Sequence, residues 1–194
     1  THKKGITSAT SIRKVLKEEK IKKLKSNLPP FVFKDLKEYP NGFDQILLAS
    51  VLTKSTEDMA KIPDCTEGLE NRIKALAKDN VSMEDLIEKV STKRYTSTRI
   101  RRILTANLLG ITQNLVSECL NSQLYAKILA VKEQEKDIIS ILSKNSSIPV
   151  LTRKSNLGDL GKTAKKCFEI DVLANDLYNL VTKKRTNENQ MIIV

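Results

Sequence analysis

Histidine and paired cysteines are scarce in this sequence, and their scarcity excludes several kinds of site. His2 is the one histidine among 194 residues, so a histidine base or a histidine-rich metal cluster has almost nothing to form from. Cys65, Cys119 and Cys167 lie far apart and form no Cys-x-x-Cys pair that could nucleate a zinc or redox site. We therefore predict free, buried thiols and no metal site.

Long apolar runs and glycine-rich loops are also missing from the sequence. No apolar stretch approaches the ~20 residues that a membrane-spanning helix needs, and no apolar signal core follows the basic N-terminus. The sequence therefore predicts a cytoplasmic protein that does not bind membranes. No glycine-rich phosphate loop occurs, and the chain begins with Thr1 instead of Met, which we interpret as the removal of an upstream segment.

Positive charge is what the chain has in excess. It carries 34 Lys and Arg against 23 Asp and Glu, which gives a formal net charge of +11. A surface of this kind attracts phosphates and gains free energy when their counterions are released, so nucleic acid is the first expected partner. With 40% hydrophobic residues the chain can also bury a substantial core, which predicts a globular protein.

Hydrophobic periodicity predicts a mainly α fold: a multi-helix bundle with a small β-sheet in the C-terminal third. A first helix is expected over residues 8–25, ended by Pro29 and Pro30. Further helices are expected over residues 46–52, 57–61, 67–78, 82–90, 97–109, 112–120, 133–142 and 168–182. One small sheet is expected from the β-prone runs at residues 124–131, 148–152 and 191–194.

The segment SATSIR, residues 8–13, places hydroxyl groups at the start of the first predicted helix. Free backbone N–H groups, the hydroxyls and the Arg13 guanidinium together suit phosphate oxygens. The simpler alternative is that Ser8 and Thr10 are ordinary capping residues and Arg13 is solvated, and the hexamer alone favours that alternative.

The segment KRYTSTRIRRI, residues 93–103, has five basic residues, one aromatic, three hydroxyl residues and no acid. If a helix begins near Thr96, its apolar residues face the core and its arginines remain outside, toward phosphates, while Tyr95 is placed to stack on an unpaired base. A solvated basic face with Tyr95 in the core explains the composition equally well. The candidate RNA-binding residues are Lys93, Arg94, Tyr95, Arg99, Arg101 and Arg102.

The segment EGLENR, residues 67–72, is a candidate positioning element. Glu70, Asn71 and Arg72 offer hydrogen bonding and charge, although an internal ion pair or cap is the preferred alternative. The adjacent carboxylates of Glu84 and Asp85 point different ways on a helix, so we expect both to be solvated.

Taken together and in this order, SATSIR, EGLENRI and STKRYTSTRIRRIL resemble the tRNA(Met) cytidine acetate ligase family. The later segments LYAKILAV, IPVLTRK and FEIDVLANDLYNL resemble the C-terminal blocks of that family. The resemblance therefore covers nearly the whole chain.

The resemblance implies an enzyme that activates acetate with ATP to acetyl-adenylate and acetylates N4 of the wobble cytidine of elongator tRNA(Met). In that family a nucleotidyltransferase-type domain with a His-containing phosphate motif performs the adenylation, and this sequence has no such motif. The chain is then expected to be a C-terminal part that mainly binds tRNA, with no catalytic residue of its own and inactive in isolation.

The same resemblance makes Ser8, Thr10 and Arg13 candidate contacts of the ATP phosphates. ATP, acetate and Mg²⁺ are expected to bind only the full-length enzyme. Residues 1–122 are expected to form the helical RNA-facing domain, and residues 123–194 a smaller α/β subdomain packed on it. The alternative function is a noncatalytic RNA-binding helical module.

Overall fold

The computed structural model describes residues 8–17, 21–36, 42–79, 82–158, 160–182 and 191–194. The chain divides into two compact units, Thr1–Asn41 and Gly42–Val194, and each is described by itself. The domain boundary that the sequence suggests after residue 122 stays a prediction. Within the described part of the chain, no helix combines the length and apolar character that crossing a membrane requires.

The first unit contains α1 (Ala9–Lys17), the 3-10 helix η1 (Ile21–Leu24) and α2 (Pro30–Leu36). The single helix expected over residues 8–25 is wrong, because the described residues form two elements there and residues 18–20 lie outside the description. Pro30 was expected to end a helix and instead begins α2. The first position of a helix needs no N–H donor, and the fixed φ of proline suits it.

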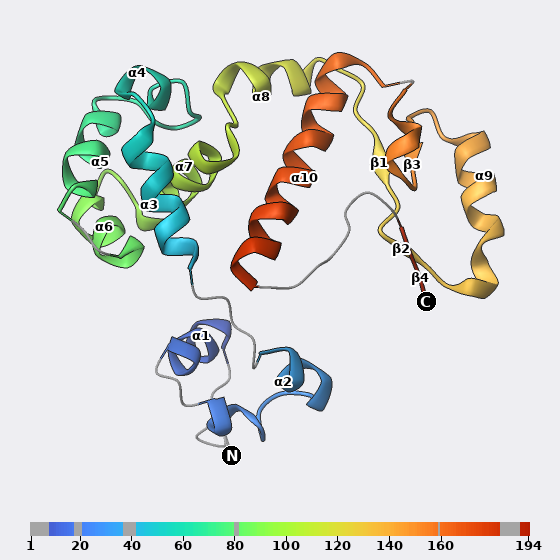
Figure 1. Ribbon diagram of the computed structural model, residues 1–194, viewed down its shortest axis with the longest axis horizontal. Helices are drawn as coiled ribbons and strands as arrows, with labels where there is room; N and C mark the ends of the chain where they lie inside the picture. Colours follow the sequence, from blue (N-terminus) through green and yellow to red (C-terminus); the bar gives the residue numbers. More distant parts are fainter. Residues whose placement is uncertain (1–7, 18–20, 37–41, 80–81, 159, 183–190) are drawn as a thin grey trace. The chain divides into compact units, whose positions relative to one another are not determined.

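The second unit begins with a body of packed helices, α3 (Phe43–Thr53), α4 (Thr56–Met59), α5 (Leu69–Ala77), α6 (Met83–Val90) and α7 (Ser97–Leu109) (Figure 1). Helix α3 packs against α5, α6 and α7, and α6 packs against both α5 and α7. Apolar side chains from all these elements form one core in which Val51, Ile73, Val90 and Ile103 are fully buried. The predicted helices over residues 67–78, 82–90 and 97–109 are confirmed to within two residues.

Hydroxyl side chains cap the N-termini of several of these helices. Ser55, Ser82 and Thr96 accept hydrogen bonds from the backbone N–H groups of Asp58, Asp85 and Arg99, respectively. Such caps satisfy donors that have no partner inside the helix. At the other end of α7, Gly110 adopts a left-handed φ of 69°, a conformation that glycine reaches without the strain a Cβ would add.

Asn107 is a buried polar residue that ties α7 to α3. Its Nδ2 donates to Ser50 Oγ at 3.1 Å, and the Ser50 hydroxyl donates onward to the Leu47 carbonyl at 2.7 Å. The backbone carbonyl of Asn107 accepts from Lys54 Nζ at 3.1 Å. Bonds of this kind offset the cost of burying polar groups and fix how the two helices are rotated against each other.

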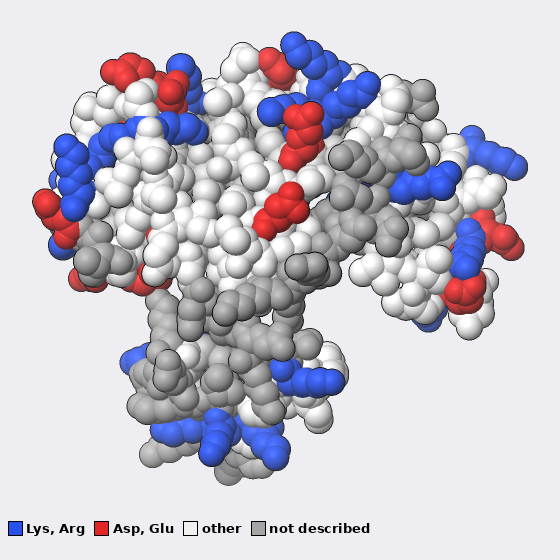
Figure 2. Space-filling model, viewed as in Figure 1, with Lys and Arg blue, Asp and Glu red and all other residues white. Residues whose placement is uncertain are grey.

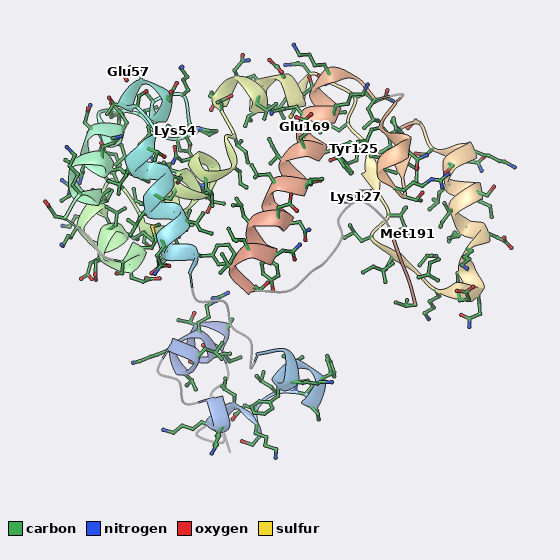
Figure 3. The ribbon with its side chains drawn as sticks, in the orientation of Figure 1. Lys54, Glu57, Tyr125, Lys127, Glu169 and Met191 are labelled. Carbon is green, nitrogen blue, oxygen red and sulfur yellow. The ribbon has the colours of Figure 1, made fainter. Side chains whose placement is uncertain are left out.

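The chain continues through α8 (Gln113–Leu120), β1 (Ala126–Lys127), β2 (Ala130–Val131), η2 (Glu133–Glu135), α9 (Asp137–Asn145), β3 (Val150–Leu151), η3 (Lys154–Leu157), α10 (Lys162–Thr182) and β4 (Ile192–Ile193). Strands β1 and β3 pair in parallel, and so do β2 and β4. A second apolar cluster of Leu151, Leu160, Ala164 and Phe168 covers the first pair. Figure 3 labels Tyr125 and Lys127 beside α10, where the Tyr125 ring lies edge-on to Phe168 with centroids 6.1 Å apart.

Three expectations for this region need correction. The described strands form two separate two-stranded sheets instead of one, and they begin at Ala126, before the C-terminal third. The helix expected to begin at Phe168 begins earlier, at Lys162. The helix expected over residues 133–142 is divided into η2 and α9.

Replacing Ile103 by Ala tests the importance of α7 in the core. Because Ile103 is fully buried, the substitution removes apolar contacts and leaves a cavity, which is expected to lower the free energy of unfolding by about 2–5 kcal/mol. Urea unfolding followed by circular dichroism measures the loss. The matched control is Leu120→Ala on α8, whose side chain is 82% exposed and whose loss is expected to cost less than about 0.5 kcal/mol. Equal losses in the two variants would contradict this description of the core.

Candidate nucleic-acid interface

The basic segment predicted from the sequence lies at the start of α7. The Thr92 hydroxyl accepts from the backbone N–H groups of Arg94 and Tyr95, at 3.2 and 3.1 Å, and Thr96 then caps the helix. Ile100, Ile103 and Leu104 are all fully buried, as predicted. Arg101 and Arg102, which lie between them, therefore face outward. We call these two residues, together with Lys93, Arg94 and Arg99 just before them, the basic edge.

A short loop preceding α5 supplies the partners of most of the basic edge. We call residues 64–67 the acidic loop. Arg102 Nη2 lies 2.8 Å from Asp64 Oδ2, and the Arg94 guanidinium forms an ion pair with Glu67. Arg99 donates through Nε and Nη2 to the Asp64 carbonyl, at 3.0 and 2.6 Å. The arginines expected to face phosphates are thus bonded within the molecule.

The acidic loop is held in an unusual backbone conformation. Asp64 and Glu67 have left-handed φ values of 65° and 64°, and Gly68 follows with 78°. Non-glycine residues adopt this region at some cost in free energy, so surrounding contacts must hold them there. Cys65 provides one such anchor, because its side chain is 1% exposed and belongs to the first core.

Tyr95 is shared between the core and the basic edge. Its ring packs against the first core, while the guanidinium carbons of Arg94 and Arg99 lie 5.8 and 5.1 Å from its centroid. Its hydroxyl is 3.5 Å from Glu67 Oε2. Cation–π contacts of this kind orient the guanidinium groups. Stacking of Tyr95 on an RNA base stays a prediction.

Arg101 and Lys93 complete the basic edge in different ways. Arg101 makes a two-pronged contact with Glu84 of α6, at 3.3 and 2.8 Å, so Glu84 is not simply solvated as the sequence suggested. Lys93 is exposed and forms no hydrogen bond or ion pair with the described residues. All three ion pairs of the basic edge are about half exposed, and exposed pairs exchange partners at little cost.

Among the three candidate positioning residues, Arg72 contacts the end of a neighbouring helix. Arg72 donates to the carbonyls of Val90 and Lys89, at 3.2 and 2.7 Å, and so closes the C-terminal end of α6. Asn71 Nδ2 donates to Glu70 Oε1 at 3.1 Å. Arg72 therefore caps a helix, which is one of the alternatives that the sequence allowed.

The SATSIR residues belong to the first unit. The Ser8 hydroxyl accepts from the Ser11 backbone N–H at 3.1 Å and lies 2.9 Å from Ser11 Oγ, so Ser8 is the predicted cap of α1. Ser8, Thr10 and Arg13 are exposed, and the side chains of Thr10 and Arg13 form no bond with residues that the structure describes. These three residues therefore belong to the first unit, whereas the basic edge belongs to the second.

A second group of lysines, at the start of α10, was not predicted from the sequence. Lys162, Lys165 and Lys166, in the first turns of α10, line an open hollow of about 500 Å³ together with Glu118 and Glu169. Lys166 pairs with Glu169 at 3.3 Å, and Lys165 donates to the Gly158 carbonyl at 3.1 Å. On the face shown in Figure 2, Lys and Arg side chains occur in several places with Asp and Glu among them.

Sequence reasoning also missed the carboxylates that pair with the basic edge. Asp64 is 38 positions from Arg102, and Glu67 is 27 from Arg94, so no local pattern joins them. The one available signal was the pair of acids in the loop segment PDCTEG. Among the described residues, no group of three or more His, Cys, Asp or Glu side chains is arranged to hold a metal ion.

Comparison with known proteins gives consistent matches over nearly the whole chain. The HIGH Nucleotidyl Transferase family matches residues 1–191. The tRNA(Met) cytidine acetate ligase of Caldanaerobacter subterraneus subsp. tengcongensis is 34% identical over 189 residues, covering 91% of this chain and 45% of that protein. The protein of the same name from Clostridium kluyveri is 35% identical over 188 residues, covering 91% of this chain and 44% of that protein.

A solved structure shares the fold. Thermotoga maritima TmcAL, bound with alpha-thio ATP, superposes with a TM-score of 0.82 at 24% identity, covering 97% of this chain and 52% of that one. The chain thus spans about half the length of the relatives it matches. Because the family matches 191 of 194 residues, the chain belongs to the HIGH nucleotidyltransferase family, among relatives that are tRNA(Met) cytidine acetate ligases.

Proposed function

We propose that this chain is the tRNA-binding, C-terminal part of a tRNA(Met) cytidine acetate ligase. The whole enzyme would activate acetate with ATP to acetyl-adenylate and transfer the acetyl group to N4 of the wobble cytidine of elongator tRNA(Met). The relatives that match more than nine-tenths of the chain carry this name, which supports the proposal. The observation that carries the RNA-binding role is the basic edge on α7, in a chain of net charge +11.

Binding of tRNA at the basic edge proceeds by exchange of anions. In the free protein, the carboxylate of Asp64 pairs with the guanidinium group of Arg102. The carboxylate of Glu67 pairs with that of Arg94. A phosphate presents oxygens in a similar geometry, and arginine binds both anions through parallel N–H donors. Phosphates of tRNA therefore replace the carboxylates, while Arg99 keeps its bonds to the Asp64 carbonyl and Lys93 adds an unpaired charge.

The nucleotide chemistry belongs to the rest of the enzyme in this proposal. Ser8, Thr10 and Arg13 would contact ATP phosphates from the start of α1, with Mg²⁺ bound in the full-length enzyme. With one histidine, this chain has no His-containing phosphate motif, so it contributes no catalytic residue and is inactive alone. Residues 1–122 would form the RNA-facing domain, residues 123–194 a smaller subdomain, and the enzyme would work in the cytoplasm.

Nucleoside analysis of modified tRNA tests the proposed activity. The full-length gene product is incubated with tRNA(Met), ATP and isotopically labelled acetate. The tRNA is then digested, and its nucleosides are separated and analysed by mass spectrometry. The expected result is a labelled N4-acetylcytidine whose formation requires both ATP and acetate. Unlabelled cytidine, with tRNA binding intact, would instead support a noncatalytic RNA-binding module.

Replacing Arg102 by Gln is expected to weaken tRNA binding by the chain about tenfold, which corresponds to ~1.4 kcal/mol. The substitution removes one guanidinium available to phosphate and leaves the buried side of α7 unchanged. Fluorescence anisotropy with labelled tRNA measures the change. Lys132→Gln is the control, because it removes the same charge from an exposed position outside the basic edge. An equal effect of the two substitutions would refute a specific role for Arg102.

Replacing Asp64 by Asn is expected to strengthen tRNA binding about threefold to tenfold, roughly 0.7–1.4 kcal/mol. The substitution removes the carboxylate that competes for Arg102 but keeps the backbone carbonyl that Arg99 uses. Asparagine is suited to the left-handed φ of this position, so the loop should keep its shape. Asp137→Asn in α9 is the charge-matched control. Weaker binding by the Asp64 variant would reject anion exchange.

A further inference from the structure

Two of the three thiols meet between α8 and α10. Cys119, in the last turn of α8, and Cys167, in the second turn of α10, bring their sulfur atoms to 3.2 Å although they are 48 positions apart in sequence. Both are free and half-buried, whereas Cys65 is buried in the first core. The expectation of free thiols is confirmed for all three cysteines, whereas the expectation of burial is confirmed for Cys65 and is wrong for Cys119 and Cys167.

Both helices that carry the thiol pair are packed against other parts of the second unit. Helices α8 and α10 pack against each other, and α10 also packs against α7. Beside Cys167, the Tyr125 hydroxyl donates to Asp171 Oδ2 at 2.9 Å, and Phe168 is buried in the second cluster. Figure 3 labels Tyr125 next to α10. Both sulfur atoms are thus carried by helices whose neighbours hold them in place.

We propose that Cys119 and Cys167 are a modification site at which a hydroperoxide forms a reversible intrachain disulfide between α8 and α10. A disulfide needs a sulfur–sulfur distance of about 2.05 Å, so the two sulfur atoms must approach by roughly 1.2 Å from their present contact. In this proposal the approach comes from rotation of the two partly exposed side chains. The site is independent of the proposed RNA-binding function.

The reaction balances with the hydroperoxide as the oxidant. One sulfur attacks the peroxide oxygen and becomes a sulfenic acid, and the alcohol derived from the peroxide leaves. The second sulfur attacks the sulfenic sulfur, and the displaced hydroxide takes up the proton of the second thiol to form water. Two thiols and one hydroperoxide thus give one disulfide, one alcohol and one water, with the two electrons passing to the peroxide.

Burial slows the attack of Cys167 on a peroxide, whereas the contact between the two sulfur atoms favours closure of the disulfide. Burial raises the pKa of Cys167 to about 11, with further contributions from the hydrogen bond to Cys119 and from the charge of Asp171. The titratable groups that contribute to this pKa are Cys119 and Asp171, and Asp171 also accepts the hydrogen bond of Tyr125. Cys167 is therefore a protonated thiol at neutral pH and resists oxidation. Once either sulfur is oxidised, the other is already in contact with it, and this contact favours closure of the disulfide.

The disulfide would covalently join α8 and α10, two helices of the second unit that pack against each other. It closes a loop that contains β1, β2, α9 and β3. Closing a loop of this length reduces the conformational entropy of the unfolded chain. The oxidised chain is therefore expected to melt at a higher temperature, by about 5 °C or more.

Mass analysis after oxidation tests the proposal in the unaltered chain. The folded chain is treated with a small excess of hydrogen peroxide, the remaining thiols are alkylated, and the peptides are mapped without reduction. The expected product is one cross-linked peptide containing Cys119 and Cys167, which disappears with dithiothreitol. Cys65 serves as the internal control and should be alkylated only after unfolding, because it is 1% exposed.

Three results would overturn the proposal. They are separate alkylation of Cys119 and Cys167 after peroxide, oxidation of either to the sulfinic acid without a cross-link, and a disulfide between two chains. The variant Cys119→Ser supplies a second readout, since it should abolish the rise in melting temperature on oxidation. If that variant does not fold, Cys167→Ser makes the same comparison, and the peptide map of the unaltered chain decides the question without either substitution.

Discussion

Burial of one face of α7 is the constraint on which the rest of the site depends. Ile100, Ile103 and Leu104 are fully buried, and Asn107 extends the same face by one turn with its hydrogen bond to α3. Residues that lie between buried positions on a helix must face outward, so packing alone decides where the arginines stand. The part of the basic edge that lies on α7 is therefore a consequence of core packing, and it exists before any ligand is present.

Arginines placed in this way repel one another, and the acidic loop relieves the repulsion in the free protein. Asp64 forms an ion pair with Arg102, and Glu67 forms one with Arg94. Both acidic residues adopt a left-handed φ, which costs backbone free energy. Because these pairs are half exposed, they hold the guanidinium groups in place without binding them strongly. The guanidinium groups of such a surface are held in position, but their carboxylate partners can be replaced. Recognition of a phosphate backbone requires both properties.

Sequence reasoning predicted the features that depend on local periodicity. The helices α5, α6 and α7, the buried face of α7 and the Ser8 cap of α1 all follow from residues within a few positions of one another. Sequence reasoning did place the runs at residues 124–131 and 191–194 in a sheet, and β2 pairs with β4 there. Contacts between distant side chains were out of its reach, such as Asp64 with Arg102 and Cys119 with Cys167. Nothing in a single sequence ties such partners together, because only the folded core brings them to one place. The misjudged Pro30 is different: proline suits both the end and the first turn of a helix, and context decides between them.

The central claim is that the basic edge binds tRNA by exchanging its internal carboxylates for phosphates. The salt dependence of tRNA affinity tests it most directly, measured for the unaltered chain and for Arg102→Gln between low and physiological ionic strength. The account predicts that the logarithm of the association constant falls linearly with the logarithm of salt concentration, with a slope smaller by about one in the variant. Identical slopes for the two proteins would contradict it, because Arg102 would then make no phosphate contact.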